Sequence, residues 1–479
     1  MPTILGANTL STGAYEVANS CRFNDGDSAY MHKTPSADGN RRTFTFSFWV
    51  KRGELTSHNP IAEVYSSGEN VSQFYFNASD QFTWYESQTS NKINLTTNAK
   101  QRDPSAWYHI VVKVDTTEST NTDRVKIYIN NELQTITSAS NTYPDQNFQS
   151  YMNSTHDAIE IGRTQYNSNQ FDGYLAEVCM VDGSALAPSS FGEADEDSPT
   201  IWKPISVSGL SFGTNGFYLD FEASDNLGND ANGGTDFTEV NLAAADQASD
   251  TCTNNFCTMN PLDNYPISTL GTFSEGNCIV VTGQGSSSSN GYSHFTGTFG
   301  LTAGKWYWEA MSTNQGAASL IGIVDKPADA ANSSLNSYTY GYSYRHSDGD
   351  IYNNGSGADY GNSYGTSDII GVALDLDNNK LYFSKGGTWQ NSGDPTSGST
   401  GTGAKSITAA ASTNTGVYHP AVGDTDYSTT STFALNFGGC PAFAISSGNA
   451  DGNGYGNFEY EPPSGYLALC TKNLGSDGG

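Results

Sequence analysis

The chain has 479 residues, too many for a single hydrophobic core, so two or three domains are expected. Only 15% of the residues are charged whereas 12% are aromatic, with 28 Tyr and 51 Gly, a composition that favours strands and turns and predicts an all-β fold. The formal net charge of −29 argues against a nucleic-acid partner, and the sequence has neither an apolar run of about 18 residues nor a basic, apolar leader, so we expect no membrane span and no secretion signal.

Three segments of the first half show the period-two alternation of half-buried strands. Phe44, Phe46 and Phe48 fall on one face of residues 44–50. Residues 107–114 and 124–129 form a predicted hairpin joined by a polar turn. We expect one core to hold the following side chains: Phe46, Phe48, Trp107, Ile127, Ile129 and Val178.

Five strings in the first half resemble a known sandwich. They are FTFSFWVKRG, WYHIVVKVDT, DRVKIYINNELQT, IEIGR and FDGYLAEVCMVDGSAL, and their succession resembles the laminin-G-like, concanavalin-A-like domain of many bacteriophage structural proteins. The resemblance implies a jelly-roll sandwich over residues 21–200, preceded by an N-terminal arm at 1–20 that we expect to anchor the chain. The closing strand 173–181, continued by Asp182-Gly183-Ser184, is the most specific part of the match.

A second group of strings resembles a SPRY domain. GKWYWEA, LIGIVD, YGYSYRHSDGDIYNNG and DIIGVALDLDNNKLYFSKGGTW follow one another, and the last of them predicts a hairpin over residues 372–383. The resemblance implies a SPRY-like sandwich over residues 266–470, after a Gly/Asn/Asp-rich connector at 201–265 and before a flexible tail at 471–479. The fold prediction is therefore all-β, with two tandem antiparallel β-sandwiches, the first concanavalin-A-like and the second SPRY-like. We expect the acidic segment 220–250, which has no neighbouring Lys or Arg, to be a solvated or interdomain segment.

Catalytic signatures are missing from the sequence. Concanavalin-A-like folds include glucanases with a paired-carboxylate strand of the E-x-D-x-x-E type, whereas Glu160 and Glu177 stand as isolated carboxylates in their strings. His109 lies on an apolar strand, and we interpret it as a hydrogen-bonded residue of the sandwich. No GxSxG elbow, Walker loop or HExxH occurs, so we expect no enzymatic activity.

No cofactor is expected. Laminin-G-like sandwiches often hold one calcium ion at the loop rim, where Asp25, Asp27 and Asp115 offer oxygen ligands, but acidic residues in turns are commonplace. The seven cysteines form an odd set, and Cys252-x4-Cys257 lacks the second ligand pair of a zinc site. Buried thiols are the favoured interpretation, and a local Cys252–Cys257 disulfide is the alternative.

Carbohydrate binding is the favoured chemistry, and the pattern places it on the second sandwich. Sugars stack on aromatic faces and hydrogen-bond to planar polar groups. The tyrosines of residues 338–344 alternate, so they share one predicted face, and polar side chains follow at a turn. The alternative is a tyrosine ladder that packs one face of the sheet. The candidate carbohydrate-binding residues are Tyr342, Tyr344, Arg345, His346, Asp350 and Trp389.

Two lectin-like sandwiches without catalytic groups predict a structural and adhesive protein. The resemblance implies a tail fibre or similar virion appendage, assembled in the host cytoplasm as a homotrimer, that contacts other virion proteins and host surface polysaccharide. Neither nucleic acid nor membrane is an expected partner. Two alternatives stay open: a purely architectural decoration protein of the capsid or tail, and an exported bacterial surface adhesin or filament subunit. In the virion interpretation the loops of the second sandwich face the host.

Overall fold

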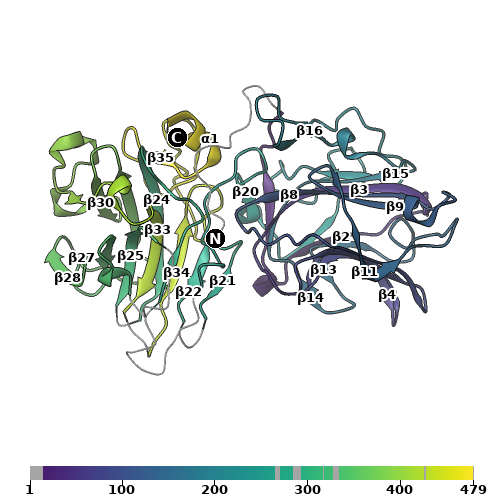
Figure 1. Cartoon of the computed structure of the whole chain (residues 1–479), viewed down its shortest axis with the longest axis horizontal. Coiled ribbons are helices and arrows are strands. Elements are labelled where there is room, and N and C mark those ends of the chain that lie inside the picture. Colours follow the sequence, from purple (N-terminus) through teal and green to yellow (C-terminus); the bar gives the residue numbers. More distant parts are fainter. Residues whose placement is uncertain are drawn as a thin grey trace. The chain divides into compact units, whose positions relative to one another are not determined.

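The computed structural model describes residues 15–264, 270–283, 293–316, 318–326, 334–425 and 428–477. The chain divides between Thr253 and Asn254 into two compact units, each containing two large sheets (Figure 1). We call the described residues 15–253 the first domain and the described residues from Asn254 onward the second domain. The predicted fold class, two tandem and mainly antiparallel β-sandwiches, is confirmed.

The first domain consists of two eight-stranded sheets and two short hairpins over residues 15–253. The first sheet, in spatial order, contains β10 (Glu132–Leu133), β9 (Val125–Ile129), β8 (Trp107–Asp115), β3 (Thr43–Arg52), β15 (Gly173–Asp182), β1 (Ser20–Phe23) and β20 (Gln247–Ala248), with β18 (Phe217–Leu219) beside β15. The second contains β11 (Ile136–Thr142), β7 (Asn91–Thr97), β6 (Phe82–Ser87), β5 (Asn70–Phe76), β4 (Asn59–Ser67), β12 (Ile159–Ile161), β2 (Tyr30–Lys33) and β19 (Thr238–Val240). The short hairpins are β13 (Arg163–Thr164) with β14 (Asn169–Gln170), and β16 (Gly192–Ala194) with β17 (Trp202–Pro204).

The core of the first domain lies between its two large sheets. Alternation sends Phe44, Phe46 and Phe48 of β3 inward, as predicted, and the hairpin of β8 and β9 is also confirmed. Five of the six predicted core residues belong to this core. Trp107 is buried on the opposite face of its sheet, because alternation along β8 sends Ile110 and Val112 into the core, and its indole Nε1 donates to Asp250 Oδ1 at 3.1 Å there.

Residues 201–253 are part of the first domain, so the prediction of a connector over 201–265 was wrong for this stretch. β18 pairs with β15, β19 with β2 and β20 with β1. The predicted solvation of the acidic segment 220–250 was wrong for Asp230 and Asp250, which are buried and pair with lysines far away in sequence, whereas Glu222, Asp225 and Asp236 are exposed. Asp230 pairs with Lys33 at 3.1 Å, and Asp250 pairs with Lys51 at 2.7 Å.

The second domain also consists of two large sheets within its described residues. One contains β21 (Thr272–Ser274), β22 (Ile279–Val281), β34 (Thr432–Asn436), β24 (Lys305–Asn314), β29 (Ile369–Asp375), β30 (Lys380–Lys385) and β31 (Thr388–Trp389), with β32 (Lys405–Ser406) beside β30 and β35 (Leu467–Ala468) beside β24. The other contains β23 (Ser293–Thr296), β33 (His419–Asp424), β25 (Ser319–Val324), β26 (Gly341–Arg345), β27 (Asp350–Asn353) and β28 (Ser356–Asp359). The predicted hairpin is β29 with β30, in which Val372 lies opposite Phe383 and Leu374 opposite Leu381.

The C-terminal segment was predicted as a flexible tail, but it folds as helix α1 (Thr471–Asp477). Leu474 is buried in the core of the second domain. Asn473 is also buried, and its Nδ2 donates to Asp451 Oδ2 at 2.7 Å. These contacts, rather than helix propensity, hold so short a helix in place.

Two further predictions concern the N-terminal arm and the cysteines. Residues 1–14 of the arm lie outside the described residues, whereas Val17 is buried and its backbone N–H donates to Thr253 Oγ1 at 3.1 Å. Cys252 carries a free thiol, so the alternative of a local disulfide with Cys257 was wrong. In the described part of the chain, no helix is long and apolar enough to cross a membrane.

Candidate carbohydrate-binding face

The tyrosines predicted to bind sugar lie in the core of the second domain. Tyr342 is 4% exposed and Tyr344 is 0% exposed. The Tyr344 ring stacks on Phe383 at 5.3 Å, and the Tyr342 hydroxyl accepts the Thr408 N–H at 3.0 Å. Tyr338 packs in a different cluster and does not share their face. The alternative interpretation, a packing ladder, is therefore correct, and neither Tyr342 nor Tyr344 is available to a ligand.

The other candidate residues of the second domain do not form one site. Arg345 lies over the Tyr352 ring at 4.2 Å and forms an ion pair with Asp348. His346 Nδ1 accepts the backbone N–H of Ser319 at 2.8 Å, and burial lowers the pKa of this imidazole. Asp350 begins the adjacent strand β27. Trp389 belongs to the other sheet, so the structure does not group it with this arginine and histidine.

Trp389 packs against a separate aromatic cluster. Its ring meets Tyr382 edge to face, with the centroids 6.5 Å apart. It is therefore a partly buried packing residue and not the open platform that the sequence suggested.

A better arrangement of rings and amides occurs on the outer face of the second sheet of the first domain. In β5 and β6, Phe74, Phe76 and Trp84 point into the core, so alternation turns Tyr75 and Tyr85 outward. Half-buried aromatic side chains, neither fully buried nor fully exposed, gather here from β4, β5, β6 and the adjoining loops. We call this set the tyrosine face: His58, Tyr65, Tyr75, Tyr85 and Tyr166.

Planar and hydroxyl side chains lie between these rings. Gln73, Tyr85 and Asn94 are direct cross-strand neighbours on β5, β6 and β7, and Asn94 is the half-buried amide of this row, whereas Gln73 is buried. In the next row, the hydroxyls of Thr83 and Thr96 are 3.0 Å apart. Aromatic faces alternating with amides and hydroxyls are the groups that recognise the apolar side and the hydroxyls of a sugar ring.

The tyrosine face is uncharged at neutral pH. His58 stacks on Tyr75 at 4.1 Å with an interplanar angle of 19°, and burial lowers the pKa of His58 to about 4. Burial also raises the pKa of Tyr75 to about 12. Both rings stay neutral near pH 7, which suits a neutral ligand on a protein of net charge −29.

A pair of carboxylates borders this face, so Glu160 is not isolated as the sequence suggested. Glu160 lies directly opposite Glu63 across β12 and β4. Arg163 binds Glu160 through both Nε at 2.9 Å and Nη2 at 2.5 Å. Burial raises the pKa of Glu63 to about 7.

The environment of Glu63 assigns it a structural role. It is 0% exposed, and its carboxylate accepts the Thr164 hydroxyl and the backbone N–H of Gln165 and Tyr166. A general acid must reach the glycosidic oxygen, which a carboxyl closed in by three donors cannot do. Glu63 therefore anchors the loop that carries Tyr166.

The structure confirms the prediction that His109 is a hydrogen-bonded residue of the sandwich. It is buried, stacks on Trp49 at 4.8 Å, and accepts the Trp202 indole N–H at Nδ1, at 2.9 Å. Its Nε2 therefore carries the proton and donates to Ser47 Oγ at 2.9 Å. Burial lowers the pKa of His109 to about 3, so the ring is neutral at physiological pH.

Two of the three proposed calcium ligands accept local hydrogen bonds. Asp115 Oδ1 accepts the Thr117 N–H, and Asp27 Oδ2 accepts Asn24 Nδ2, both at 3.1 Å. Over the described ranges, no group of three or more His, Cys, Asp or Glu side chains is arranged to hold a metal ion.

The architecture defines a tandem of two β-sandwiches. Residues 25–189 match the family model described as the concanavalin A-like lectin/glucanases superfamily, and residues 305–424 match the SPRY domain. The chain thus carries a laminin-G-type, concanavalin-A-like domain followed by a SPRY domain, as the resemblance predicted. Domains of these two kinds are typically non-catalytic binding modules.

Individual relatives match parts of the chain. ATP-dependent RNA helicase Ddx1 of Drosophila melanogaster is 32% identical over 124 residues, which is 25% of this chain and 16% of the helicase. The chain therefore spans about a sixth of the length of that relative. A putative carbohydrate binding protein from Bacteroides ovatus is 17% identical with a TM-score of 0.34, covering 47% of this chain and 58% of its own. The SPRY domain of human HERC1 is 16% identical with a TM-score of 0.28, covering 38% of this chain and 97% of its own.

Proposed function

We propose that this chain is a non-catalytic glycan-binding protein that holds a polysaccharide on its tyrosine face. The observation that carries the proposal is the grouping of half-buried aromatic rings with amide and hydroxyl side chains on one outer sheet face. Tyr75 and Tyr85 supply stacking surfaces there, and the half-buried Asn94 supplies a donor and an acceptor. Because the sheet positions these side chains before any ligand arrives, little ordering entropy opposes binding.

We further propose that the protein acts in a bacteriophage virion, as a homotrimeric fibre or surface appendage that contacts host polysaccharide and neighbouring virion proteins. The resemblance of the five strings of the first domain to phage structural proteins supports this context, and the strong negative charge is compatible with a soluble, exposed particle component. Locating the chain in a reconstruction of purified particles tests the proposal. Absence from the particle contradicts it, and so does a position enclosed within the particle.

Polysaccharide binding by the full chain tests the tyrosine face. Binding is measured with a polysaccharide to which the unaltered chain binds. Tyr75→Ala and Tyr85→Ala should each weaken this binding roughly tenfold, because an aromatic stacking contact contributes about 1–1.5 kcal/mol. Tyr352→Ala, a half-buried tyrosine of the second domain, is the matched control. Loss of binding in Tyr352→Ala but not in Tyr85→Ala would assign the site to the second domain instead.

A further inference from the structure

The first domain has a cavity of about 220 Å³, which is lined by none of the residues that define the tyrosine face. It is lined by the end of β2 and the loop after it, by the start of β12 and the segment before it, by Met180 of β15, and by the segments 213–217 and 232–235. We call it the rim cavity. At about 30 Å³ per water molecule, it has room for roughly seven waters, which is enough for one sugar ring but not for a chain.

The floor and the rim of this cavity differ in chemistry. The floor is apolar and is formed by Met152, Ile159, Met180 and Phe217, which are all buried. The rim consists of hydroxyl and amide side chains and of glycine backbone, with Asn215 as the half-buried amide. The site is therefore amphipathic, which is typical of pockets that fix a small ligand by a few polar groups above an apolar base.

Lys33 is the one charged side chain among the residues that line the rim cavity, and an ion pair neutralises it. Lys33 is paired with Asp230 at 3.1 Å and lies over the Phe217 ring at 5.8 Å. Asp230 Oδ2 accepts a hydrogen bond from one of the three N–H donors of the Lys33 ammonium. This balance, in a protein of net charge −29, disfavours an anionic ligand and leaves donors for a hydroxyl or carbonyl oxygen.

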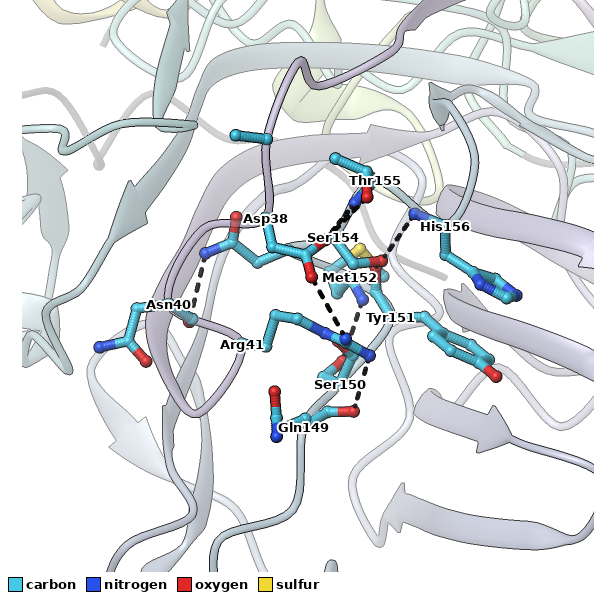
Figure 2. A network of polar contacts seen from close by, with 12 residues as sticks. Asp38, Asn40, Arg41, Gln149, Ser150, Tyr151, Met152, Ser154, Thr155 and His156 are labelled. Atoms are coloured by element: carbon cyan, nitrogen blue, oxygen red, sulfur yellow. Dashed lines mark hydrogen bonds and ion pairs between the residues drawn. The ribbon is translucent and has the colours of Figure 1, made fainter.

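A polar network fixes the loops that bring Met152 and Asn153 to the cavity. Figure 2 shows Asp38 accepting both the backbone N–H and the hydroxyl of Thr155, at 2.7 and 2.9 Å. Arg41 Nε donates to the Ser150 carbonyl at 2.8 Å, so the two loops are bonded on both sides of the methionine (Figure 2).

Asp182, from the string DGS that marks the end of β15, joins a third segment to these loops. Its Oδ1 accepts Asn153 Nδ2 and the Asn40 N–H, both at 2.7 Å. Its Oδ2 accepts the N–H groups of Thr214 and Asn215, both at 3.2 Å. One carboxylate therefore positions three of the lining segments, and the cavity is preorganised rather than an accidental gap between loops.

We propose that the rim cavity binds a single N-acetylated amino-sugar residue. The acetamido methyl packs against Met152 and Met180, and the ring hydroxyls face the amide rim with Lys33. A methyl group buried on an apolar floor separates an N-acetylhexosamine from its parent hexose, whereas a purely polar pocket would not discriminate between them. This proposal deepens the proposed glycan-binding function and uses a different site, so the two can fail separately.

Titration of the full chain with two matched pairs of free sugars tests the proposal. The pairs are N-acetylglucosamine with glucose and N-acetylgalactosamine with galactose. In at least one pair, the acetylated sugar should bind with a dissociation constant on the order of 1 mM and at least about fivefold more tightly than its parent. Equal binding within both pairs, or no binding of any of the four sugars, overturns the proposal.

Substitutions locate the binding event. Ser36 is an exposed residue of the rim, so Ser36→Trp should cover the opening without disturbing the core and weaken binding of the acetylated sugar at least tenfold. Ser119→Trp, at an exposed loop position that does not line the cavity, is the control and should bind normally. Unchanged binding in Ser36→Trp overturns the assignment. Tyr85→Ala should leave monosaccharide binding intact, which separates this site from the tyrosine face.

Discussion

Glu63 should make the first domain more stable in mild acid than at neutral pH. Burial raises its pKa in the folded chain to about 7, whereas its ordinary value is 4.5. The folded state therefore binds a proton more readily than the unfolded state between these two values. The stabilisation is complete below about pH 4.5 and is lost as the pH rises through about 7.

The size of this effect follows from the two pKa values. At 1.36 kcal/mol per pKa unit, the full difference amounts to about 3 kcal/mol, of which about 2.5 kcal/mol falls between pH 5 and pH 8. Glu63→Gln keeps a planar group of the same shape but cannot ionise. The free energy of unfolding of this variant, relative to that of the unaltered protein, should therefore rise by about 2.5 kcal/mol from pH 5 to pH 8.

Denaturant unfolding of the full chain at several pH values measures this difference, because contributions of the second domain cancel between variants. Glu69→Gln, at an exposed turn position, is the matched control and should follow the unaltered protein at every pH. If Glu63→Gln keeps a constant offset from the unaltered protein between pH 5 and pH 8, then Glu63 is ionised in the folded state and the reasoning fails.

Three further predictions concern packing and assembly. Phe48→Ala should lower the free energy of unfolding of the first domain by about 3–5 kcal/mol, and a loss below about 1 kcal/mol in denaturant unfolding would contradict its place in the core. Leu474→Ala should cost about 2–5 kcal/mol, measured in the same way on the full chain, whereas a flexible tail would show no change. Light scattering on the purified protein should report a multiple of 51.1 kDa, with three copies expected, and a monomer at micromolar concentration would contradict the fibre proposal.

Much of the fold follows from period-two alternation. The inward phenylalanines of β3 and the hairpin of β29 and β30 are predictable because each strand carries a regular run of strong apolar residues at every second position. The strands β18 and β19 are not predictable in this way, since each has three residues and lies in a Gly- and Asn-rich stretch. Pairing with β15 and β2 defines these two strands, together with distant contacts such as the ion pair between Asp230 and Lys33.

The same dependence on tertiary packing explains why the candidate carbohydrate-binding face lies in the first domain and not in the second, where the sequence predicted it. A tyrosine is amphipathic, so its position depends on what competes for the inner face of its strand. In β26 the alternate position is Ser343, which leaves Tyr342 and Tyr344 as the most apolar residues of the strand, and both turn inward.

In β5 and β6 the competition has the opposite result. Phe74, Phe76 and Trp84 occupy the inner positions, and this leaves Tyr75 and Tyr85 for the outer face. The informative signal is therefore the residue next to each tyrosine rather than the tyrosine itself. A tyrosine flanked by stronger apolar residues is displaced to the outer face of its sheet, and its ring stays accessible only where nothing covers that face: Tyr75 is half-buried, whereas Tyr307, between Trp306 and Trp308, is buried in a second cluster. Applied to the sequence QFYFNAS, this rule places Tyr75 outside without any knowledge of the partner sheet.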